Sequence, residues 1–338
     1  MRTLILGGTG WLGGHLAAEA LRLGHEVACL ARGAAVPPGA VLVQADRDRE
    51  DALTAVSGSA WDAVIDVSST PLHVRRAVRE VRCGVYMFVS TTSVYAVNSV
   101  IGATEDAELL APSDDPASYG AAKVACEQAV LAGAAPALIA RAGLIGGPGD
   151  PTGRSSYWPW RFAHPAVPGS VLVPDAPGLL TSVLDVRDLA RWLVSSAEAE
   201  VAGVMNVCGA PVPLGEHLAV ARGGSSAVPV AVAEDWLLAR GVGQWSGPGS
   251  LPLWIADPEW RGFSARSTGL AEAAGLERRP LAETLRAAVH EPGRRAGLPN
   301  ERERDLLAAW QPGDSRRSAC RRHKWHLAVG DRRRLAIR

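Results

Sequence analysis

Short apolar runs alternate with segments of helical periodicity along most of the chain, and the pattern starts at the N-terminus. Residues 3–6 form an apolar run that predicts a buried strand, and a glycine-rich turn follows it. Residues 15–23 carry apolar side chains at helical spacing, and Gly24 is placed to end that helix in a left-handed conformation. The next apolar run covers residues 25–30. Strand, turn, helix and strand make a βαβ unit, which implies a parallel sheet.

The alternation of strands and helices continues beyond this unit. Further strands are expected at residues 41–46, 63–67, 85–90, 137–143 and 204–209. Helices are expected at residues 50–56, 71–81, 119–131, 183–196 and 300–310, the last with capping-box spacing at its start. Such a repeat is typical of an α/β fold with a doubly wound, Rossmann-type parallel sheet.

The pattern loosens midway along the chain, which indicates a second, smaller unit. We assign residues 1–147 and about 182–208 to a dinucleotide-binding domain. A C-terminal substrate-binding lobe then takes residues 148–181 and 209–312. Residues 313–338 are rich in arginine and aperiodic, so we expect this tail to be disordered.

Composition and charge narrow the class of protein. The chain has 338 residues and a formal net charge of +0, so bulk charge predicts neither a membrane nor a nucleic-acid partner. Only the tail from Asp314 onward is basic, with nine Lys/Arg against two Asp. Five cysteines without a C-x-x-C pair argue against a disulfide framework or a zinc site and fit a reducing compartment. No segment resembles a signal peptide or a bilayer span, so we expect a cytoplasmic protein.

The turn after the first strand has the composition of a phosphate-binding loop, with three glycines in a G-x-x-G-x-x-G pattern. Glycine allows a tight turn, a close approach of the backbone to a pyrophosphate, and close packing of helix on strand. The helix N-terminus adds free N–H groups and a positive dipole end. A turn that binds nothing is the alternative, but the strand–turn–helix context favours a nicotinamide dinucleotide. The expected contacts in the turn are Gly7, Thr9, Gly10, Trp11, Leu12 and Gly13.

The end of the second strand indicates which dinucleotide fits. An acidic residue there would bind the ribose 2′-hydroxyl of NAD and repel a 2′-phosphate. This chain has Arg32 and no acid, which favours NADP(H) over NAD(H), unless Arg32 is an ordinary surface arginine. Asp46 ends the third strand, where it either binds the adenine or caps a turn. Val67 and Ser68 end the fourth strand and should line the cofactor cleft.

A tyrosine and a lysine supply candidate acid–base chemistry, since Tyr119 and Lys123 share one face of an expected helix. Tyrosine has a pKa of about 10, and a nearby cation should lower that pKa, so that the phenol can exchange a proton with a substrate oxygen. A packed tyrosine beside a surface lysine is the structural alternative. However, the only other lysine, Lys324, lies in the tail. Hydroxyls at residues 90–93 follow a strand, where one of them either bonds the reacting oxygen or satisfies its own backbone.

Several motifs, in this order, resemble those of the extended short-chain dehydrogenase/reductase superfamily, often called the NAD-dependent epimerase/dehydratase family. They are GGTGWLG, STTSVY and YGAAK, followed by similar segments at residues 138–150 and 182–190. The resemblance covers roughly residues 1–300. Two residues depart from the family pattern: Ala142 stands where proline is usual after the arginine, and Ala96 stands where glycine is common. Neither departure touches the proton-transfer chemistry.

The resemblance implies roles for three side chains. It implies Thr91 as the donor to the substrate oxygen, with Thr92 and Ser93 left open. It implies Tyr119 as the catalytic acid/base and Lys123 as the residue that holds the nicotinamide ribose and tunes Tyr119.

The expected lobe is rich in tryptophan and arginine. Aromatic rings can stack on a sugar or a base, although large aromatics more often belong to the core. Trp158 is a candidate for such stacking, and Arg154, Arg161 and Arg266 are candidates to hold an anionic substrate group. The histidines of this region have no ligand-spaced partners, so we expect no metal.

Three functions are compatible with these features. The first is an NADP-linked oxidoreductase that acts on a small-molecule carbonyl or alcohol, with Tyr119 exchanging the oxygen proton. The second is an epimerase or dehydratase of a nucleotide-linked sugar, in which the cofactor is reduced and reoxidised within one turnover. The third is a non-catalytic sensor or nucleic-acid-binding protein, which the basic tail favours and the retained Tyr119 and Lys123 do not. A homodimer stays open, because no particular residue argues for it.

Overall fold

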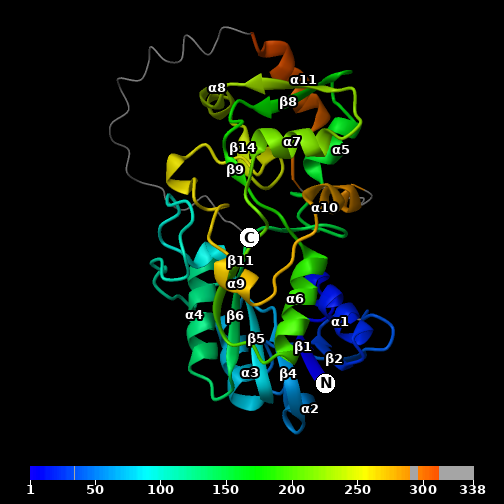
Figure 1. Cartoon of the computed structure of the whole chain (residues 1–338), viewed down its shortest axis with the longest axis vertical. Coiled ribbons are helices and arrows are strands. Elements are labelled where there is room, and N and C mark those ends of the chain that lie inside the picture. The colour runs from blue at the N-terminus through cyan, green and yellow to red at the C-terminus, as the bar shows by residue number, and fades with distance from the viewer. Residues whose placement is uncertain (34, 290–295, 312–338) are drawn as a thin grey trace.

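The structure is a computed structural model that describes residues 1–33, 35–289 and 296–311. In the view of Figure 1, a central sheet flanked by helices lies below a smaller lobe. Within these residues, no helix combines the length and the apolar character that crossing a membrane requires.

Seven parallel strands form the central sheet, and the expected Rossmann-type α/β class is confirmed. The order across the sheet is β11 (Gly203–Val207), β6 (Ala137–Ala142), β5 (Arg82–Thr91), β4 (Ala60–Asp66), β1 (Arg2–Leu6), β2 (Glu26–Ala31) and β3 (Val41–Gln44). The winding reverses between β1 and β4. Ligands of doubly wound sheets bind in the crevice at such a point, beyond the carboxyl ends of the strands.

Helices cover both faces of the sheet (Figure 1). They are α1 (Trp11–Arg22), α2 (Thr54–Ser57), α3 (Pro71–Glu80), α4 (Tyr119–Leu131) and α6 (Val186–Glu198). In β1, Ile5 packs into the core under α1 and α6, whereas Leu4 and Leu6 pack into the core under α3 and α4. Because successive side chains of a strand point to opposite faces, burial on both faces explains the continuous apolar runs in the sequence.

Helix ends follow local sequence in some places and distant partners in others. Gly24 has a φ of +83°, as expected for a left-handed residue after α1. Helix α11 (Asn300–Ala309) has no capping box, so that prediction is wrong. Asn300 Oδ1 accepts a hydrogen bond from Arg161 at 2.6 Å, and Glu303 forms an ion pair with Arg161. Both side chains therefore serve a partner far away in the sequence.

The lobe has an apolar core of its own, in which Trp158 and Trp254 are fully buried. Its elements and connections are α5 (Tyr157–Ala163), α7 (Leu214–Arg222), α8 (Glu234–Ala239), α10 (Leu281–Ala288), β7 (Ile145–Gly146), β8 (Ser170–Pro174), β9 (Leu180–Thr181), β10 (Leu184–Asp185), β12 (Val212–Pro213), β13 (Val228–Val232), β14 (Gly243–Trp245), β15 (Ser250–Pro252) and the 3₁₀ turn η2 (Pro258–Trp260). The 3₁₀ turn η1 (Thr92–Val94) instead follows β5 directly, beside α4. Strands β8 and β13 pair in parallel. Helix α9 (Gly269–Ala273) instead packs beside β11 at the edge of the central sheet.

A fully buried ion pair attaches α11 to the rest of the lobe. Arg161 Nε lies 2.8 Å from Glu303 Oε2, and neither side chain has exposed surface. Arg161 also donates to the carbonyl of Leu298 at 2.5 Å. Glu303 Oε1 accepts from the backbone N–H of Leu172 in β8 at 3.0 Å. Since a buried charge without its partner is costly, the position of α11 depends on Arg161.

Replacing Arg161 by methionine should lower the free energy of unfolding by about 3–5 kcal/mol, because the Glu303 carboxylate would stay buried without its partner. Urea unfolding followed by tryptophan fluorescence measures this change. Arg75→Met is the matched control, since Arg75 pairs with Asp114 at the surface, where ion pairs contribute little. If the two variants unfold at the same urea concentration, the buried pair does not stabilise the lobe.

Candidate active site

The glycine-rich turn places the start of α1 close to the end of β1. Gly7 has a φ of +100°, in the left-handed region that glycine adopts without strain. A Cβ atom at Gly13 would lie 2.2 Å from the carbonyl oxygen of Gly7, so only glycine allows this packing distance. No side chain caps the first N–H groups of α1, which leaves them for a phosphate group. The turn therefore fits the pyrophosphate of a dinucleotide.

A pocket of about 550 Å³ beside this turn has the position expected for the adenosine half of a dinucleotide. The turn and the ends of β2, β3 and β4 line it, including Thr9, Arg32, Asp46 and Ser68. The side chain of Arg32 is exposed. Asp46 Oδ1 accepts a hydrogen bond from the backbone N–H of Asp48 at 3.1 Å, so Asp46 caps a turn and also borders the pocket.

A second arginine at this pocket is engaged with a buried carboxylate. Arg47 forms two bonds with Asp66, at 2.9 and 3.0 Å, and Tyr86 donates to the same carboxylate at 2.8 Å. Burial would raise the pKa of Asp66, but the charge and hydrogen bonds of Arg47 hold that pKa below its usual value. Arg32 is therefore the pocket arginine whose side chain is available to a ligand.

A neighbouring pocket of about 310 Å³ brings the glycine turn and the acid–base candidates together. Residues 10–13 form part of its wall, and Thr91, Tyr119 and Lys123 form another part. Val67, at the end of β4, borders both this pocket and the adenosine-side pocket. The turn and the two helical side chains thus face one crevice, which is the arrangement that a nicotinamide enzyme requires.

Tyr119 is the first residue of α4, and its hydroxyl shares a hydrogen bond with Thr91. Burial raises the pKa of Tyr119 above its ordinary value, while Thr91 and the charge of Arg154 oppose this rise. The expectation that Lys123 lowers this pKa is therefore wrong. With a raised pKa, the phenol is neutral at neutral pH and is a proton donor.

Lys123 lies one helical turn after Tyr119, and only 3% of its surface is exposed. Its Nζ donates to the carbonyl of Ser68 at 2.7 Å and to that of Val89 at 2.6 Å. These acceptors direct the ammonium toward the ends of β4 and β5, which explains why its charge does not lower the pKa of Tyr119. Burial lowers the pKa of Lys123 to about 8. Its third N–H remains for a ligand in the pocket.

The three hydroxyls after β5 lie at the same pocket but differ in their bonds. Thr91, Thr92 and Ser93 all line it, and Thr91 is the one that meets Tyr119. Thr91 Oγ1 also accepts a hydrogen bond from the backbone N–H of Ser93 at 3.1 Å. This local cap fixes the Thr91 side chain next to the phenol.

A chain of buried polar contacts supports the crevice from behind. Ser90 of β5 donates to Glu127 of α4 at 2.5 Å, and Glu127 pairs with Arg141 of β6 at 2.9 Å. Arg141 donates to the hydroxyl of Tyr95 at 3.0 Å, and that hydroxyl donates to Asn206 of β11 at 2.6 Å. The chain links three strands to α4, so Tyr119 and Lys123 rest on rigid elements.

Of the four candidates for substrate recognition, the structure places one at the pocket of Tyr119 and three away from it. Trp158 and Arg161 are fully buried in the lobe, and Arg266 is 3% exposed beside the ring of Tyr95. None of these three lines the pocket of Tyr119, whereas Arg154 does. The local sequence around each arginine does not indicate whether its side chain is buried, because burial depends on how distant segments pack around it.

Two aromatic side chains of the lobe, Trp245 and Phe263, complete the pocket wall beside Arg154. They lie 5.2 Å apart between ring centroids, in an edge-to-face arrangement. Neither belongs to a motif or to a periodic segment, so the sequence carries no signal for them. Within the described ranges, no three His, Cys, Asp or Glu side chains are grouped as metal ligands.

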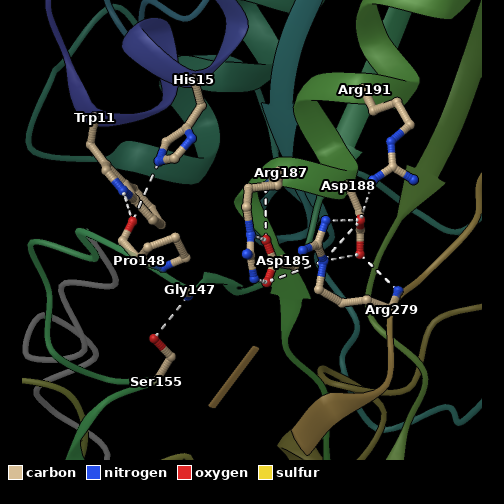
Figure 2. A network of polar contacts seen from close by, with 10 residues as sticks. All are labelled: Trp11, His15, Gly147, Pro148, Ser155, Asp185, Arg187, Asp188, Arg191 and Arg279. Carbon is tan, nitrogen blue, oxygen red and sulfur yellow. Dashed lines mark hydrogen bonds and ion pairs between the residues drawn. The ribbon is translucent and has the colours of Figure 1, made fainter. Parts of the chain in front are cut away.

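The loop after β7 contacts the start of α1 across the crevice (Figure 2). Trp11 Nε1 donates to the carbonyl of Pro148 at 2.7 Å, and His15 Nε2 lies 3.4 Å from the same oxygen. The N–H of Gly147, just before Pro148, donates to Ser155 Oγ at 3.2 Å. The first residues of the loop are thus bonded both to the start of α1 and to the far end of the loop.

Figure 2 also shows how two aspartates fix the start of α6. Asp185 accepts a hydrogen bond from the N–H of Arg187 at 2.9 Å and caps the helix. Asp188 instead pairs with Arg279 at 2.7 Å. The second pair attaches a C-terminal segment to the dinucleotide side of the molecule.

Comparisons with known proteins agree with this geometry. A sequence model of the NAD dependent epimerase/dehydratase family matches residues 3–79. The expected resemblance to this family is confirmed. A search of curated proteins finds no match to the sequence.

Solved structures share the fold over most of the chain. A protein described as an epimerase from Burkholderia cenocepacia superposes with a TM-score of 0.67 at 21% identity, covering 85% of this chain and 96% of that one. The UDP-glucose 4-epimerase of Thermus thermophilus, in complex with NAD, gives 0.60 at 19% identity and covers 86% and 98%. WbmG of Bordetella bronchiseptica, with NAD and UDP, gives 0.58 at 18% identity and covers 88% and 99%. These likenesses show a shared fold, and the family match adds a sequence resemblance over residues 3–79.

Replacing Gly13 by alanine should abolish dinucleotide binding, because the new Cβ would overlap the carbonyl oxygen of Gly7 and push α1 away. Titration with NADPH, followed by its fluorescence, measures the affinity, and circular dichroism confirms that the variant is folded. Gly14→Ala is the matched control, since a Cβ at Gly14 meets nothing within 4 Å. Equal affinities for the two variants would show that the turn does not hold the cofactor.

Proposed function

We propose that the protein is an NAD(P)-dependent enzyme that reduces or oxidises a C–O bond of a small molecule, with Tyr119 as the acid/base. The observation that carries this proposal is the one pocket lined by the glycine turn and by Thr91, Tyr119 and Lys123. A bound nicotinamide dinucleotide would supply or accept the hydride. The residues that would hold it are Gly7, Thr9, Gly10, Trp11, Leu12, Gly13, Arg32, Asp46, Val67, Ser68 and Lys123.

Two side chains act at the reacting oxygen in this proposal, and a third binds the cofactor. Thr91, which is hydrogen-bonded to Tyr119, orients the substrate oxygen beside the phenol. Because burial raises the pKa of Tyr119, the neutral phenol donates its proton to the oxygen when a carbonyl is reduced. The reverse reaction needs the phenolate and is favoured at higher pH. Lys123 offers its remaining N–H to a ribose hydroxyl.

The first candidate is net reduction of a carbonyl or oxidation of an alcohol, with Tyr119 exchanging the proton of the reacting oxygen. The second candidate is epimerisation or dehydration of a nucleotide-linked sugar, which the NAD-bound and UDP-bound neighbours favour. Nicotinamide absorbance, followed with substrate in excess, separates the two. A lasting change in absorbance that matches product formation supports the oxidoreductase. Turnover without a lasting change supports the epimerase or dehydratase.

Replacing Tyr119 by phenylalanine should reduce turnover by about a hundredfold or more, because general acid–base catalysis contributes an effect of this order. The affinity for the dinucleotide should change little, since only the proton-transfer hydroxyl is removed. Steady-state kinetics and NADPH titration measure the two quantities on the same preparation. Unchanged turnover would exclude Tyr119 as the acid/base.

We propose a preference for NADP(H) over NAD(H) on the basis of Arg32. Arg32 is exposed at the adenosine-side pocket, Arg47 is occupied by Asp66, and β2 ends without an acid. The neighbouring structures named above with a cofactor contain NAD, so the preference rests on these residues alone.

The variant Arg32→Ala should weaken NADPH binding by about tenfold or more and leave NADH binding nearly unchanged, because only NADPH carries the 2′-phosphate. Titrations with both dinucleotides under the same salt conditions measure the effect. Equal losses of affinity for NADPH and NADH would remove the basis for the proposed NADP(H) preference.

The cellular setting is also proposed from the chain itself. Cys29, Cys83, Cys126 and Cys208 are free thiols, which suits the reducing cytoplasm. A small-molecule substrate is the expected partner. The basic tail lies outside the described residues, so nucleic-acid binding through it and a homodimer stay predictions from sequence.

A further inference from the structure

Arg154 differs from Arg47, Arg141 and Arg161 in its partners. Arg266 also has no ion pair with a described residue, but only Arg154 of these two lines the pocket of Tyr119. Arg47, Arg141 and Arg161 each form an ion pair with a buried carboxylate. Arg154 is 9% exposed and forms no ion pair with a described residue. Its Nε donates to Thr152 Oγ1 at 3.1 Å. Its two terminal nitrogens make no hydrogen bond in the described part of the chain.

The acid whose charge reaches Arg154 is Asp150, but its oxygens bind other groups and form no direct ion pair with the guanidinium. Asp150 Oδ1 accepts from the N–H and the hydroxyl of Thr152, at 2.8 and 2.7 Å. Asp150 Oδ2 accepts from the N–H and the hydroxyl of Ser155, at 3.2 and 2.8 Å. These bonds shape the loop around Arg154. Its guanidinium stays charged at any physiological pH, and its terminal nitrogens have no direct carboxylate partner among the described residues.

The guanidinium lies at the pocket of Tyr119. It stands 5.2 Å from the ring of Trp245, and its charge acts on the Tyr119 hydroxyl. The described residues that line this pocket include two cations, Lys123 and Arg154, and no aspartate or glutamate. Lys123 already donates to two backbone carbonyls. Arg154 is therefore the cation that can form a bidentate contact with an oxyanion.

We infer that Arg154 is a specificity-determining residue that binds an oxyanion, a carboxylate or a phosphate, carried by the substrate close to its reacting C–O bond. The inference rests on the proposed function for the identity of the reacting oxygen. The pocket of about 310 Å³ must also receive the nicotinamide end of the cofactor, so the oxyanion at Arg154 and the reacting oxygen lie close together. The substrate class is therefore an oxo or hydroxy acid, or the corresponding phosphate ester.

The test uses matched pairs of small oxo compounds with and without the anion. Acetoacetate is compared with methyl acetoacetate, and dihydroxyacetone phosphate with dihydroxyacetone. Dissociation constants are measured by calorimetry on Tyr119→Phe protein, with and without NADPH, so that no turnover interferes. We expect at least one anion to bind about ten- to a hundredfold more tightly than its neutral counterpart. For each pair, the dissociation constant of the neutral compound is divided by that of the anion. The pair with the larger ratio shows whether carboxylate or phosphate is recognised.

Adding Arg154→Met should bring that ratio close to one, while Arg154→Lys should retain part of it, because lysine keeps the charge and loses the forked geometry. Arg191→Met on α6 is the control, since Arg191 is exposed and away from the pocket. Equal binding of anion and neutral compound before the Arg154 change, or a ratio that survives Arg154→Met, would overturn the inference. Failure of NADPH to bind would contradict the proposed function instead, and the anion ratio would still decide the role of Arg154.

Discussion

The close approach of α1 to the end of β1 is the constraint on which the rest of the site depends. The helix can start at Trp11 only because Gly13 brings no side chain against the carbonyl of Gly7. This approach aims the free N–H groups of α1 at the crevice where the winding of the sheet reverses. The positions of the adenosine-side pocket and of the Tyr119 pocket follow from it, because both include residues of the turn.

The second requirement is rigidity on the opposite side of the crevice. Helix α4 presents Tyr119 and Lys123, and its buried Glu127 is bonded to strands on both sides of it through Ser90 and Arg141. A buried network of this kind is stable only when every member has a partner, and here each charge has one. Burial thus produces two results at once: it orders the helix, and it shifts the pKa values of Tyr119 upward and of Lys123 downward.

Much of the fold could be predicted from the sequence, because its signals are local. Strands buried on both faces appear as continuous apolar runs, and α4 begins at Tyr119 and ends at Leu131 as its periodicity predicts. The predictions that failed depend on contacts between distant segments. Nothing near Asn300 indicates that its side chain bonds Arg161, and nothing near Lys123 indicates that carbonyls of two strands bind its ammonium.

Contacts between distant segments also decide which arginines of the lobe are buried. The sequence places Arg154 and Arg161 only seven positions apart, yet Arg161 is buried against Glu303 and Arg154 reaches the crevice. Hydrophobic periodicity cannot distinguish them, because both lie in a segment of mixed aromatic and polar residues. Only the packing of α11 against α5 decides which guanidinium is enclosed.

The contact between Trp11 and Pro148 has a consequence for the shape of the crevice. Trp11 follows the phosphate-binding glycines, and Pro148 opens the loop that carries Arg154, so one indole N–H joins the two halves of the crevice. Because Pro148 lies six positions before Arg154, this single hydrogen bond fixes the distance between the start of α1 and the loop on the substrate side.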